Sequence, residues 1–416
     1  PGVLATPHPV SSELAAPRAA ARSSPRVALV HDWLTGMRGG ERCLEVVCEL
    51  FPDAPLFTLL HVPGTVSPVI ERRRVVTSFV QRLPAAAAHY RRYLPLFPAA
   101  VRRFDLSRYD LVLSLSHCVA KGVRTPPGAL HLCYCFTPMR YVWDLAQDYL
   151  GARAGLATRL LAPPVAAALR RWDRRTQSVH GVVAISRHIA ERIRRVWGRE
   201  ADVIHPPVDV DRFRIADRVD DYYLVVSALV PYKRIDLAIG AARRLGRRLV
   251  IVGAGPEDRR LRALAGPGIE FLGWRDDREV ADLYARCRAV LFPAVEDFGI
   301  VPLEAAAAGR PTIALGRGGV LETMVGLESA PASGHPRSVP GSQAPMNGAA
   351  PTAVFFREQT VEALTEAIRA FEAAADRFDP EALRARALEF DRPVFKRRLS
   401  EYVDARWREF RARQAC

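Results

Sequence analysis

The feature that most constrains the fold is an alternation of short apolar strands and helical segments, which runs along the chain twice. The first half contains the apolar runs RVALVHDW, YDLVLSLSH, LHLCYCF and VHGVVAIS, each followed by a loop and mostly by helical patterning. The second half repeats the order with YYLVVSAL, RLVIVGAGPE, IEFLGW, AVLFPA and PTIAL. Because strands that alternate with helices form parallel sheets, the sequence predicts an α/β protein with two doubly wound units.

Proline-rich and low-complexity segments indicate where these units begin and end. The paired prolines of VIHPPVDVDRF interrupt the alternation, so we expect an N-terminal domain over residues 26–207 and a C-terminal domain over residues 208–392. Residues 1–25 are rich in Ala, Pro and Ser and predict a disordered lead-in, while residues 326–352 predict a flexible insertion. Residues 393–416 predict a last helix that packs back towards the N-terminal domain.

The formal net charge of +15 raises the question of a nucleic-acid partner, because clustered basic residues bind phosphate backbones. Of the 60 basic residues only Lys121, Lys233 and Lys396 are lysines, an excess of arginine that genome composition explains better than one ligand. The sequence also lacks zinc-finger, recognition-helix and ribonucleoprotein motifs, so we expect no nucleic acid as partner. It contains no uncharged apolar run of about 18 residues and no signal-peptide core, which predicts a cytoplasmic protein.

The stretch VEDFGIVPLEAAAAGRPTIAL carries two glutamates at the expected cleft edge of the second sheet. Glu296 follows the strand AVLFPA, and Phe298, Gly299 and Ile300 begin a helix whose unpaired N–H groups suit a phosphate. Glu304 lies one turn further on, where a ribose could donate two hydroxyl protons, and Glu296 could accept from a second sugar. In the alternative interpretation, Glu296 caps the helix and Glu304 meets a surface arginine.

Other strand ends of the second half add residues that fit a nucleotide. Lys233 follows the strand YYLVVSAL at the start of a helix, where its charge can neutralise a diphosphate, although alone it would be an ordinary surface residue. The segments VGAGPE and FLGW place Gly253, Gly255 and Trp274 at two further turns, where a base could lie against the backbone.

These residues resemble retaining glycosyltransferases of family 4, whose GT-B fold has two Rossmann-like domains facing a central cleft. The resemblance covers residues 26–325 and 353–410, and its most specific part is the E-x7-E spacing from Glu296 to Glu304. It implies a nucleotide-sugar donor held mainly by the C-terminal domain. Glu304 would bind the ribose hydroxyls, Glu296 the donor sugar and Lys233 the diphosphate, with the backbone around Gly299 touching sugar and phosphate.

The N-terminal half narrows the resemblance to one branch. The segments HDWLTGMRGGE, SLSHCVAKGV and CYCFTPMRYVWD are similar to transferases that use GDP-mannose in O-antigen or exopolysaccharide assembly. This implies an α-mannosyltransferase that acts on a glycan or lipid-linked acceptor. His117 matches the strand-end histidine near the sugar, and Arg38, Gly39 and Gly40 match a glycine loop; for His117 a structural role is the alternative.

Two positions depart from the family pattern. Ala228 replaces an arginine that many members place against the diphosphate, which leaves Arg234 or Arg38 to assist Lys233. Phe136 stands where a polar residue is expected. Both departures bear on the donor rather than on the class of enzyme.

The expected chemistry needs neither metal nor cofactor. Departure of a nucleoside diphosphate develops negative charge on phosphate, which lysine, arginine and helix N-termini stabilise. Asp209 and Asp211 of VDVD imitate a metal-binding Asp-x-Asp, but they lie in the proline-rich turn and are interpreted as a cap and turn. With no assignable carboxylate nucleophile, a front-face displacement is favoured. A nucleotide-sugar epimerase and an inactive sugar-nucleotide-binding scaffold remain as alternatives, whereas GMRGGE does not fit a dehydrogenase fingerprint.

The segment HYRRYLPLFPAAVRRF suggests a peripheral membrane contact. Its apolar residues fall on one stripe at helical spacing and its four arginines largely outside it, a pattern that suits an anionic membrane surface. The alternative is an ordinary helix packed on the N-terminal core and broken by Pro95 and Pro98. The residues of the stripe are Tyr90, Tyr93, Leu94, Phe97, Val101 and Phe104, and the arginines are Arg91, Arg92, Arg102 and Arg103.

Overall fold

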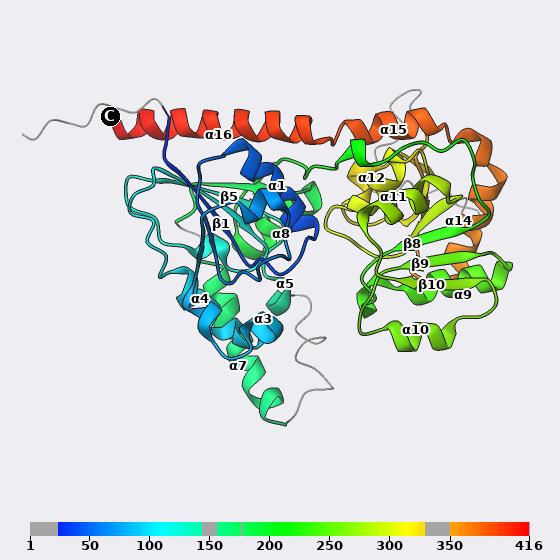
Figure 1. Ribbon diagram of the computed structural model, residues 1–416, viewed down its shortest axis with the longest axis horizontal. Coiled ribbons are helices and arrows are strands. Elements are labelled where there is room, and N and C mark those ends of the chain that lie inside the picture. The colour runs from blue at the N-terminus through cyan, green and yellow to red at the C-terminus, as the bar shows by residue number, and fades with distance from the viewer. Residues whose placement is uncertain (1–23, 144–155, 176–177, 329–349, 416) are drawn as a thin grey trace, which may run out of the picture.

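The computed structural model describes residues 24–143, 156–175, 178–328 and 350–415, which form two parallel seven-stranded sheets side by side (Figure 1). The first sheet has the order β3-β2-β1-β4-β5-β6-β7 and the second the order β10-β9-β8-β11-β12-β14-β13. In chain order, the first sheet comprises β1 (Val27–His31), β2 (Leu56–Thr58), β3 (Val75–Thr77), β4 (Leu111–Ser116), β5 (Leu130–Cys135), β6 (Gly181–Ala184) and β7 (Asp202–Val203). The second comprises β8 (Tyr223–Val226), β9 (Leu249–Val252), β10 (Ile269–Gly273), β11 (Ala289–Phe292), β12 (Thr312–Leu315), β13 (Gly326–Glu328) and β14 (Ala353–Phe356).

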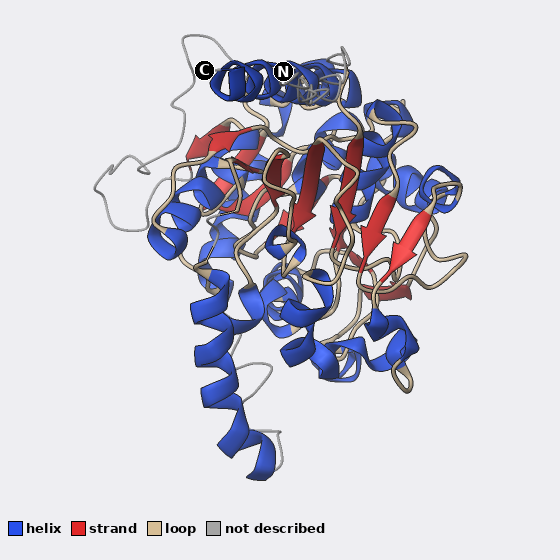
Figure 2. Cartoon of the chain, turned by 90° about the vertical axis from the view of Figure 1, so that its left-hand side faces the viewer, coloured by secondary structure: helices blue, strands red, loops and turns tan. Residues whose placement is uncertain are grey.

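Helices lie on either face of the strands, as in other doubly wound sheets (Figure 2). In the first half they are α1 (Gly39–Leu50), α2 (Pro68–Glu71), α3 (Ala86–His89), α4 (Phe97–Val101), α5 (Arg140–Trp143), α7 (Leu156–Asp173) and α8 (Arg187–Trp197). In the second half they are α9 (Ile235–Leu245), α10 (Asp258–Leu264), α11 (Asp277–Arg286), α12 (Ile300–Ala307), α13 (Val320–Thr323), α14 (Val361–Ala373), α15 (Pro380–Leu388) and α16 (Arg392–Ala415). Every residue of the central strands β4 and β5 is buried, so the sequence runs that predicted them are apolar on both faces.

Local signals explain where several of these helices begin and end. Ser186 caps α8 by accepting a hydrogen bond from the Ile189 amide, and Gly198 ends it in the left-handed conformation. Asp276 and Glu279 form a capping box at the start of α11. These caps fix the helix starts that border the cleft between the two sheets.

The last helix joins the two halves. It runs along the first sheet, whereas α15 lies beside the second (Figure 1). Phe395, Leu399 and Val403 of α16 are buried, and the Phe395 ring packs edge-on against Tyr134 of β5 at 5.7 Å. The C-terminal helix therefore packs on the N-terminal sheet.

One segment differs from the sequence-based expectation, and a second follows the alternative that was given for it. The expected insertion over residues 326–352 begins with a strand, because Gly326–Glu328 pairs in parallel with β14 and extends the edge of the second sheet; residues 329–349 lie outside the described part, as do residues 1–23 of the expected lead-in. The segment around Pro95 and Pro98 divides into α3, a 3-10 helix at Tyr90–Leu96 and α4, since prolines interrupt a continuous helix.

The apolar residues of that segment mostly face the protein interior. Tyr90, Phe97, Val101 and Phe104 are buried in the core beneath the first sheet. The four arginines of the segment are exposed, but the apolar stripe is not available as a membrane-inserting face. Among the described helices, none is long and apolar enough to span a bilayer.

Candidate functional site

The two acids of the E-x7-E segment lie at the end of β11 and in α12. Gly299 precedes α12 with a φ of +92°, a conformation that favours glycine and lets the chain turn into the helix. Glu296 lies in the preceding loop and pairs with Lys233, which ends the 3-10 turn Pro231–Lys233 after β8. Both side chains are less than one-fifth exposed. The structure thus brings together two of the residues that the sequence assigned to one site.

Glu304 is held by a tyrosine that sequence reasoning did not identify. The Tyr284 hydroxyl donates to the Glu304 carboxylate at 2.9 Å. Burial raises the pKa of Glu304, and the nearby positive charges of Arg42 and Arg212 oppose that rise only in part. A half-buried carboxylate of this kind is set up to accept further hydrogen bonds from ligand hydroxyls.

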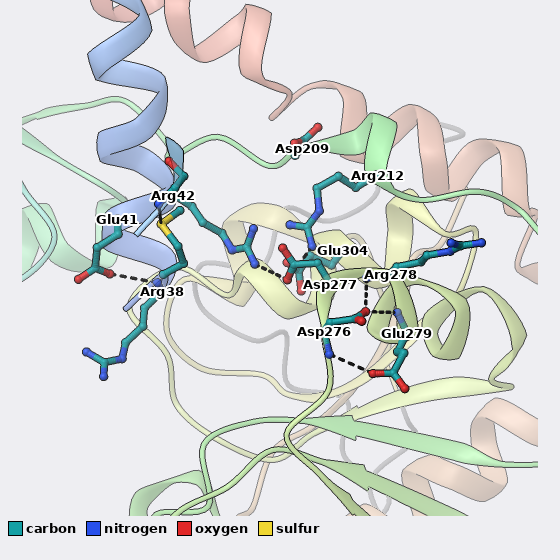
Figure 3. Close-up of polar contacts among 12 residues, drawn as sticks. Arg38, Glu41, Arg42, Asp209, Arg212, Asp276, Asp277, Arg278, Glu279 and Glu304 are labelled. Atoms are coloured by element: carbon teal, nitrogen blue, oxygen red, sulfur yellow. Dashed lines mark hydrogen bonds and ion pairs between the residues drawn. The ribbon is translucent and has the colours of Figure 1, made fainter. Parts of the chain in front are cut away.

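An arginine from the N-terminal half pairs with an aspartate of the C-terminal half near Glu304. Arg42 in α1 pairs with Asp277 at the start of α11 at 2.6 Å, and Arg212 pairs with the same carboxylate at 3.1 Å (Figure 3). A small pocket between the halves is lined by Arg42, Arg212, Glu304 and Ile300, together with residues of the linker and α16. The sequence did not indicate that Arg42 belongs to this site.

The helix N-termini of the two halves meet beside that pocket. Gly39 and Gly40 form the first turn of α1 rather than a separate glycine loop, which corrects the expectation, and Arg38 precedes them as the N-cap residue. A Cβ atom on Gly39 would lie 2.9 Å from the Ile300 side chain at the start of α12. Gly39 therefore allows the two helix starts to approach closely, and both direct unpaired N–H groups into the same region.

His117 directly follows β4 in the N-terminal half. Its Nδ1 atom is 3.2 Å from the buried carboxylate of Asp32, and its ring lies edge-on to Trp33 at 4.4 Å between centroids. The Phe136 ring also neighbours His117, with 6.4 Å between the ring centroids. Because position 136 packs beside this ring, an apolar residue suits it. Burial lowers the pKa of His117, although Asp32 opposes the shift.

Beside His117 lies a second buried acid–base pair, which the sequence analysis missed. The Nε2 atom of His31 is 3.8 Å from the Glu41 carboxylate, and Glu41 also accepts the backbone N–H of Arg38 at 3.1 Å. Burial by itself raises the pKa of Glu41, but the interactions with His31, with His117 and with the Glu41 backbone together outweigh it, and the pKa lies below its usual range. The HD pair that ends β1 was the available sequence signal, because polar residues at a buried strand end are unusual.

Asp297, between the two glutamates in sequence, ties the halves together. Its backbone carbonyl accepts a hydrogen bond from Ser186 at 2.6 Å, and its carboxylate lies 3.5 Å from Arg140 and 3.9 Å from Arg192. Burial raises the pKa of Asp297 while both arginines lower it. Asp297 was not among the predicted site residues.

Four of the residues predicted to bind the sugar-nucleotide donor have surroundings that do not require a ligand. A Cβ atom on Gly253 would lie 1.8 Å from the Ser227 carbonyl oxygen, and one on Gly255 would lie 2.3 Å from that of Leu229, so close backbone packing alone requires both glycines. Arg234 pairs with Asp236 at 3.1 Å. Trp274 follows β10 with 74% of its surface exposed, so it is accessible to a ligand but is not held in a pocket.

The Asp-x-Asp sequence behaves as a turn. Asp209 pairs with Arg392 at 3.2 Å, and Asp211 lies in the 3-10 turn Val210–Arg212. In the ranges that the structure describes, no group of three or more His, Cys, Asp or Glu side chains is arranged to hold a metal ion.

The second half of the chain is similar to known glycosyltransferases. Residues 220–333 match the sequence model of the family described as glycosyl transferases group 1. The D-inositol 3-phosphate glycosyltransferases of Mycobacterium bovis and Mycobacterium tuberculosis are 30% identical over 158 residues, which is 32% of this chain and 33% of theirs. The chain thus matches about one third of the length of these curated relatives.

Solved structures resemble most of the chain. Anabaena Alr3699/HepE in complex with UDP is 17% identical with a TM-score of 0.62, and covers 91% of this chain and 100% of that one. Sucrose-phosphate synthase from Thermosynechococcus elongatus is 16% identical with a TM-score of 0.63, and covers 91% and 98%. At these identities the likeness is one of fold, and it confirms the GT-B arrangement of two Rossmann-like, doubly wound domains.

Proposed function

We propose that this chain is a retaining glycosyltransferase that moves a hexose from a nucleotide-sugar donor to a glycan or lipid-linked acceptor in cell-surface polysaccharide synthesis. The observation that carries the proposal is the grouping of Lys233, Glu296 and Glu304 around the start of α12, where it meets the start of α1. These groups match the parts of a nucleotide sugar. The cation and the helix-start N–H donors suit its diphosphate, and the two carboxylates suit the hydroxyls of its two sugar rings.

The charges suggest how the reaction is promoted. As the nucleoside diphosphate leaves, negative charge grows on the phosphate nearest the sugar, and Lys233 together with the two helix starts stabilises it. Lys233 must exchange its contact with Glu296 for the diphosphate, which frees Glu296 to accept from the donor sugar. In the retaining reaction the acceptor oxygen attacks the same face of the sugar from which the diphosphate departs, and the leaving phosphate takes the acceptor proton.

For the donor we propose GDP-mannose, because the N-terminal segments that carry His117 resemble mannosyltransferases. UDP-glucose is the competing donor, since Alr3699/HepE is known in complex with UDP and with UDP-glucose. No cofactor and no metal enter this proposal.

For the acceptor we propose a lipid-linked glycan reached at the cytoplasmic face of an anionic membrane. The exposed arginines Arg91, Arg92, Arg102 and Arg103 support a reversible electrostatic contact. Since most of the apolar stripe beside them is buried, this contact would not involve insertion into the bilayer.

Ligand binding and donor turnover test the function directly. Thermal shift with GDP, UDP and ADP, each with and without its sugar, should show stabilisation by one base and further stabilisation by one sugar nucleotide. Incubation with that donor alone should release the free sugar and nucleoside diphosphate slowly. Conversion of the donor into an epimeric sugar would instead identify an epimerase, and binding with neither reaction in the presence of lipid-linked glycan would identify an inactive scaffold.

A further inference from the structure

Arg140, the first residue of α5, reaches from the N-terminal half to the loop that precedes α12. Its guanidinium lies 3.5 Å from the Asp297 carboxylate and 5.5 Å from the centre of the Tyr232 ring, and both of these residues belong to the C-terminal half. The Arg140 side chain keeps 24% of its surface exposed, so it is accessible to a ligand that binds between the halves.

Lys233 shares these surroundings with Arg140. Its ammonium group lies 5.7 Å from the centre of the same Tyr232 ring and pairs with Glu296, the residue directly before Asp297. Two cations from opposite halves therefore lie around one ring, each beside one of two adjacent acids. The helix α12 begins three residues after Asp297, and the unpaired N–H groups of its first turn attract anions. The arrangement offers a diphosphate two cations and a helix start in one place.

Asp297 can release Arg140 without becoming a buried charge that lacks a cation. The buried arginine Arg192 lies 3.9 Å from one carboxylate oxygen of Asp297, whereas Arg140 lies by the other. The 3.5 Å contact with Arg140 is also longer than a charge-assisted hydrogen bond, which measures about 2.7 to 2.9 Å. A phosphate that accepts two N–H bonds from the planar guanidinium would hold Arg140 more strongly than Asp297 does.

The N-terminal half fixes the position of α5 by contacts of its own. The indole Nε1 of Trp143 donates to the buried Asp173 carboxylate at 2.8 Å, and Nε of Arg170 donates to the Val142 carbonyl at 2.6 Å. Asp173 and Arg170 both belong to α7, so the short helix α5 is tied to a longer one. The backbone of Arg140 is therefore positioned without the help of Asp297.

We propose that Arg140 supplies a second cation to the diphosphate of the donor, beside Lys233, so that both halves of the chain contact that group. The inference rests on the proposed function, because it requires a nucleotide-sugar donor. The alternative is a structural role in which Arg140 only joins the halves through Asp297. The two roles predict different results when the arginine and the aspartate are replaced separately.

Binding of a nucleoside diphosphate and of its nucleoside by Arg140→Gln tests the diphosphate contact. GDP, UDP and ADP are titrated by calorimetry, and the nucleoside of the one that binds is measured by displacement of that diphosphate. We expect Arg140→Gln to lose about tenfold to a hundredfold in affinity for the diphosphate and less than about twofold for the nucleoside. Arg140→Lys should lose less, because the charge remains although the planar fork is absent.

Asp297→Asn is the matched control, since it removes the acid from the contact and keeps Arg140. We expect its affinity for the diphosphate to equal or exceed that of the wild type, because a negative charge near the phosphates is lost. A loss as large as that of Arg140→Gln would assign Arg140 the structural role. An unchanged diphosphate affinity in Arg140→Gln, or equal losses for diphosphate and nucleoside, would also overturn the inference. If the wild type binds none of the three diphosphates, the proposed function fails and this inference with it.

Discussion

Arg42 and Asp277 form an ion pair of 2.6 Å that joins the first helix of the N-terminal sheet to a helix of the C-terminal sheet. A second acid also links the two halves. Glu322 of α13 accepts hydrogen bonds from the backbone N–H groups of Arg187 and His188 at the start of α8, at 2.8 and 3.0 Å. Its carboxylate also lies 3.1 Å from the Nε2 atom of His205. The two contacts differ in burial, because Asp277 is 62% exposed whereas Glu322 is 10% exposed. Because of this difference in burial, we expect the two contacts to contribute unequally to the stability with which the two halves are held together.

We therefore expect Glu322→Ala to loosen the two halves more than Arg42→Ala. Loss of Glu322 leaves two helix-start amides without their acceptor and should cost about 1 to 3 kcal/mol, whereas the exposed pair contributes less than about 1 kcal/mol. Urea unfolding measures the stability, and small-angle scattering measures the separation of the halves. Equal effects of the two substitutions would contradict the ranking.

Glu304 should contribute to binding of the nucleoside part of the donor. Glu304→Ala is expected to weaken nucleoside diphosphate binding by about 1.5 to 3 kcal/mol, the range for hydrogen bonds to a charged group, without unfolding the protein. Tyr284→Phe is the matched control, since it removes the hydroxyl that donates to Glu304 but keeps the carboxylate. Calorimetry gives both affinities, and an unchanged affinity for Glu304→Ala would exclude the ribose assignment.

Lys233 should matter most when the diphosphate departs. We expect Lys233→Ala to lower kcat more than it weakens nucleoside diphosphate binding, with Lys233→Arg retaining more activity because the charge remains. Wild-type activity should survive a chelator. Steady-state kinetics and binding on the same variants check this, and a strict requirement for magnesium or manganese would argue against charge stabilisation by Lys233 and the helix starts alone.

The exposed arginines near α4 should bind anionic lipid by charge alone. Each contributes at most about 1 kcal/mol near such a surface, so we expect binding to vesicles containing anionic lipid at low ionic strength and release at high salt. Changing Arg91, Arg92, Arg102 and Arg103 to glutamine should remove most of the binding. Vesicle co-sedimentation measures it; equal binding by the variant, or none by the wild type at any salt, would remove this segment from the proposed membrane contact.

His131 should make the protein sensitive to acid. The side chain is fully buried, and its Nε2 atom is hydrogen-bonded to the Ser114 hydroxyl at 2.9 Å. Burial lowers the pKa of His131 from 6.5 to about 3. Because the folded-state pKa lies below the unfolded one, stability present above pH 6.5 is lost as the pH falls towards 3. Between pH 7.5 and 5 this one group should cost about 2 kcal/mol of unfolding free energy, so His131→Gln should show a correspondingly smaller loss in urea unfolding at the two pH values. An equal loss of unfolding free energy in the wild type and in His131→Gln between the two pH values would contradict this prediction.

The sequence by itself determined nine of the described strands, their parallel arrangement in two sheets and the convergence of Lys233 with Glu296, but it did not predict β2, β3, β7, β13 or β14. The reason is geometric: parallel strands direct their carboxyl ends to one edge, so residues that follow two neighbouring strands meet whatever the rest of the chain does. The start of α12 is likewise a local property, because Gly299 tolerates the positive φ of the turn and Pro302 is accommodated in the first turn of a helix.

The tertiary structure alone decided which residues meet across the cleft and how the polar groups pair. Arg42 reaches Asp277 near Glu304 only because the two sheets pack in one relative orientation, which no local period encodes. Asp32 and His117 lie 85 positions apart, and their contact depends on β1 and β4 being neighbours in register. Gly253 and Gly255 are an example in the opposite direction. Their sequence pattern indicates turns that contact a ligand, whereas in the fold they are glycines because the carbonyl oxygens of Ser227 and Leu229 leave no room for a Cβ atom. Side-chain pairing is a consequence of distances between elements, and those distances exist only once the elements have packed.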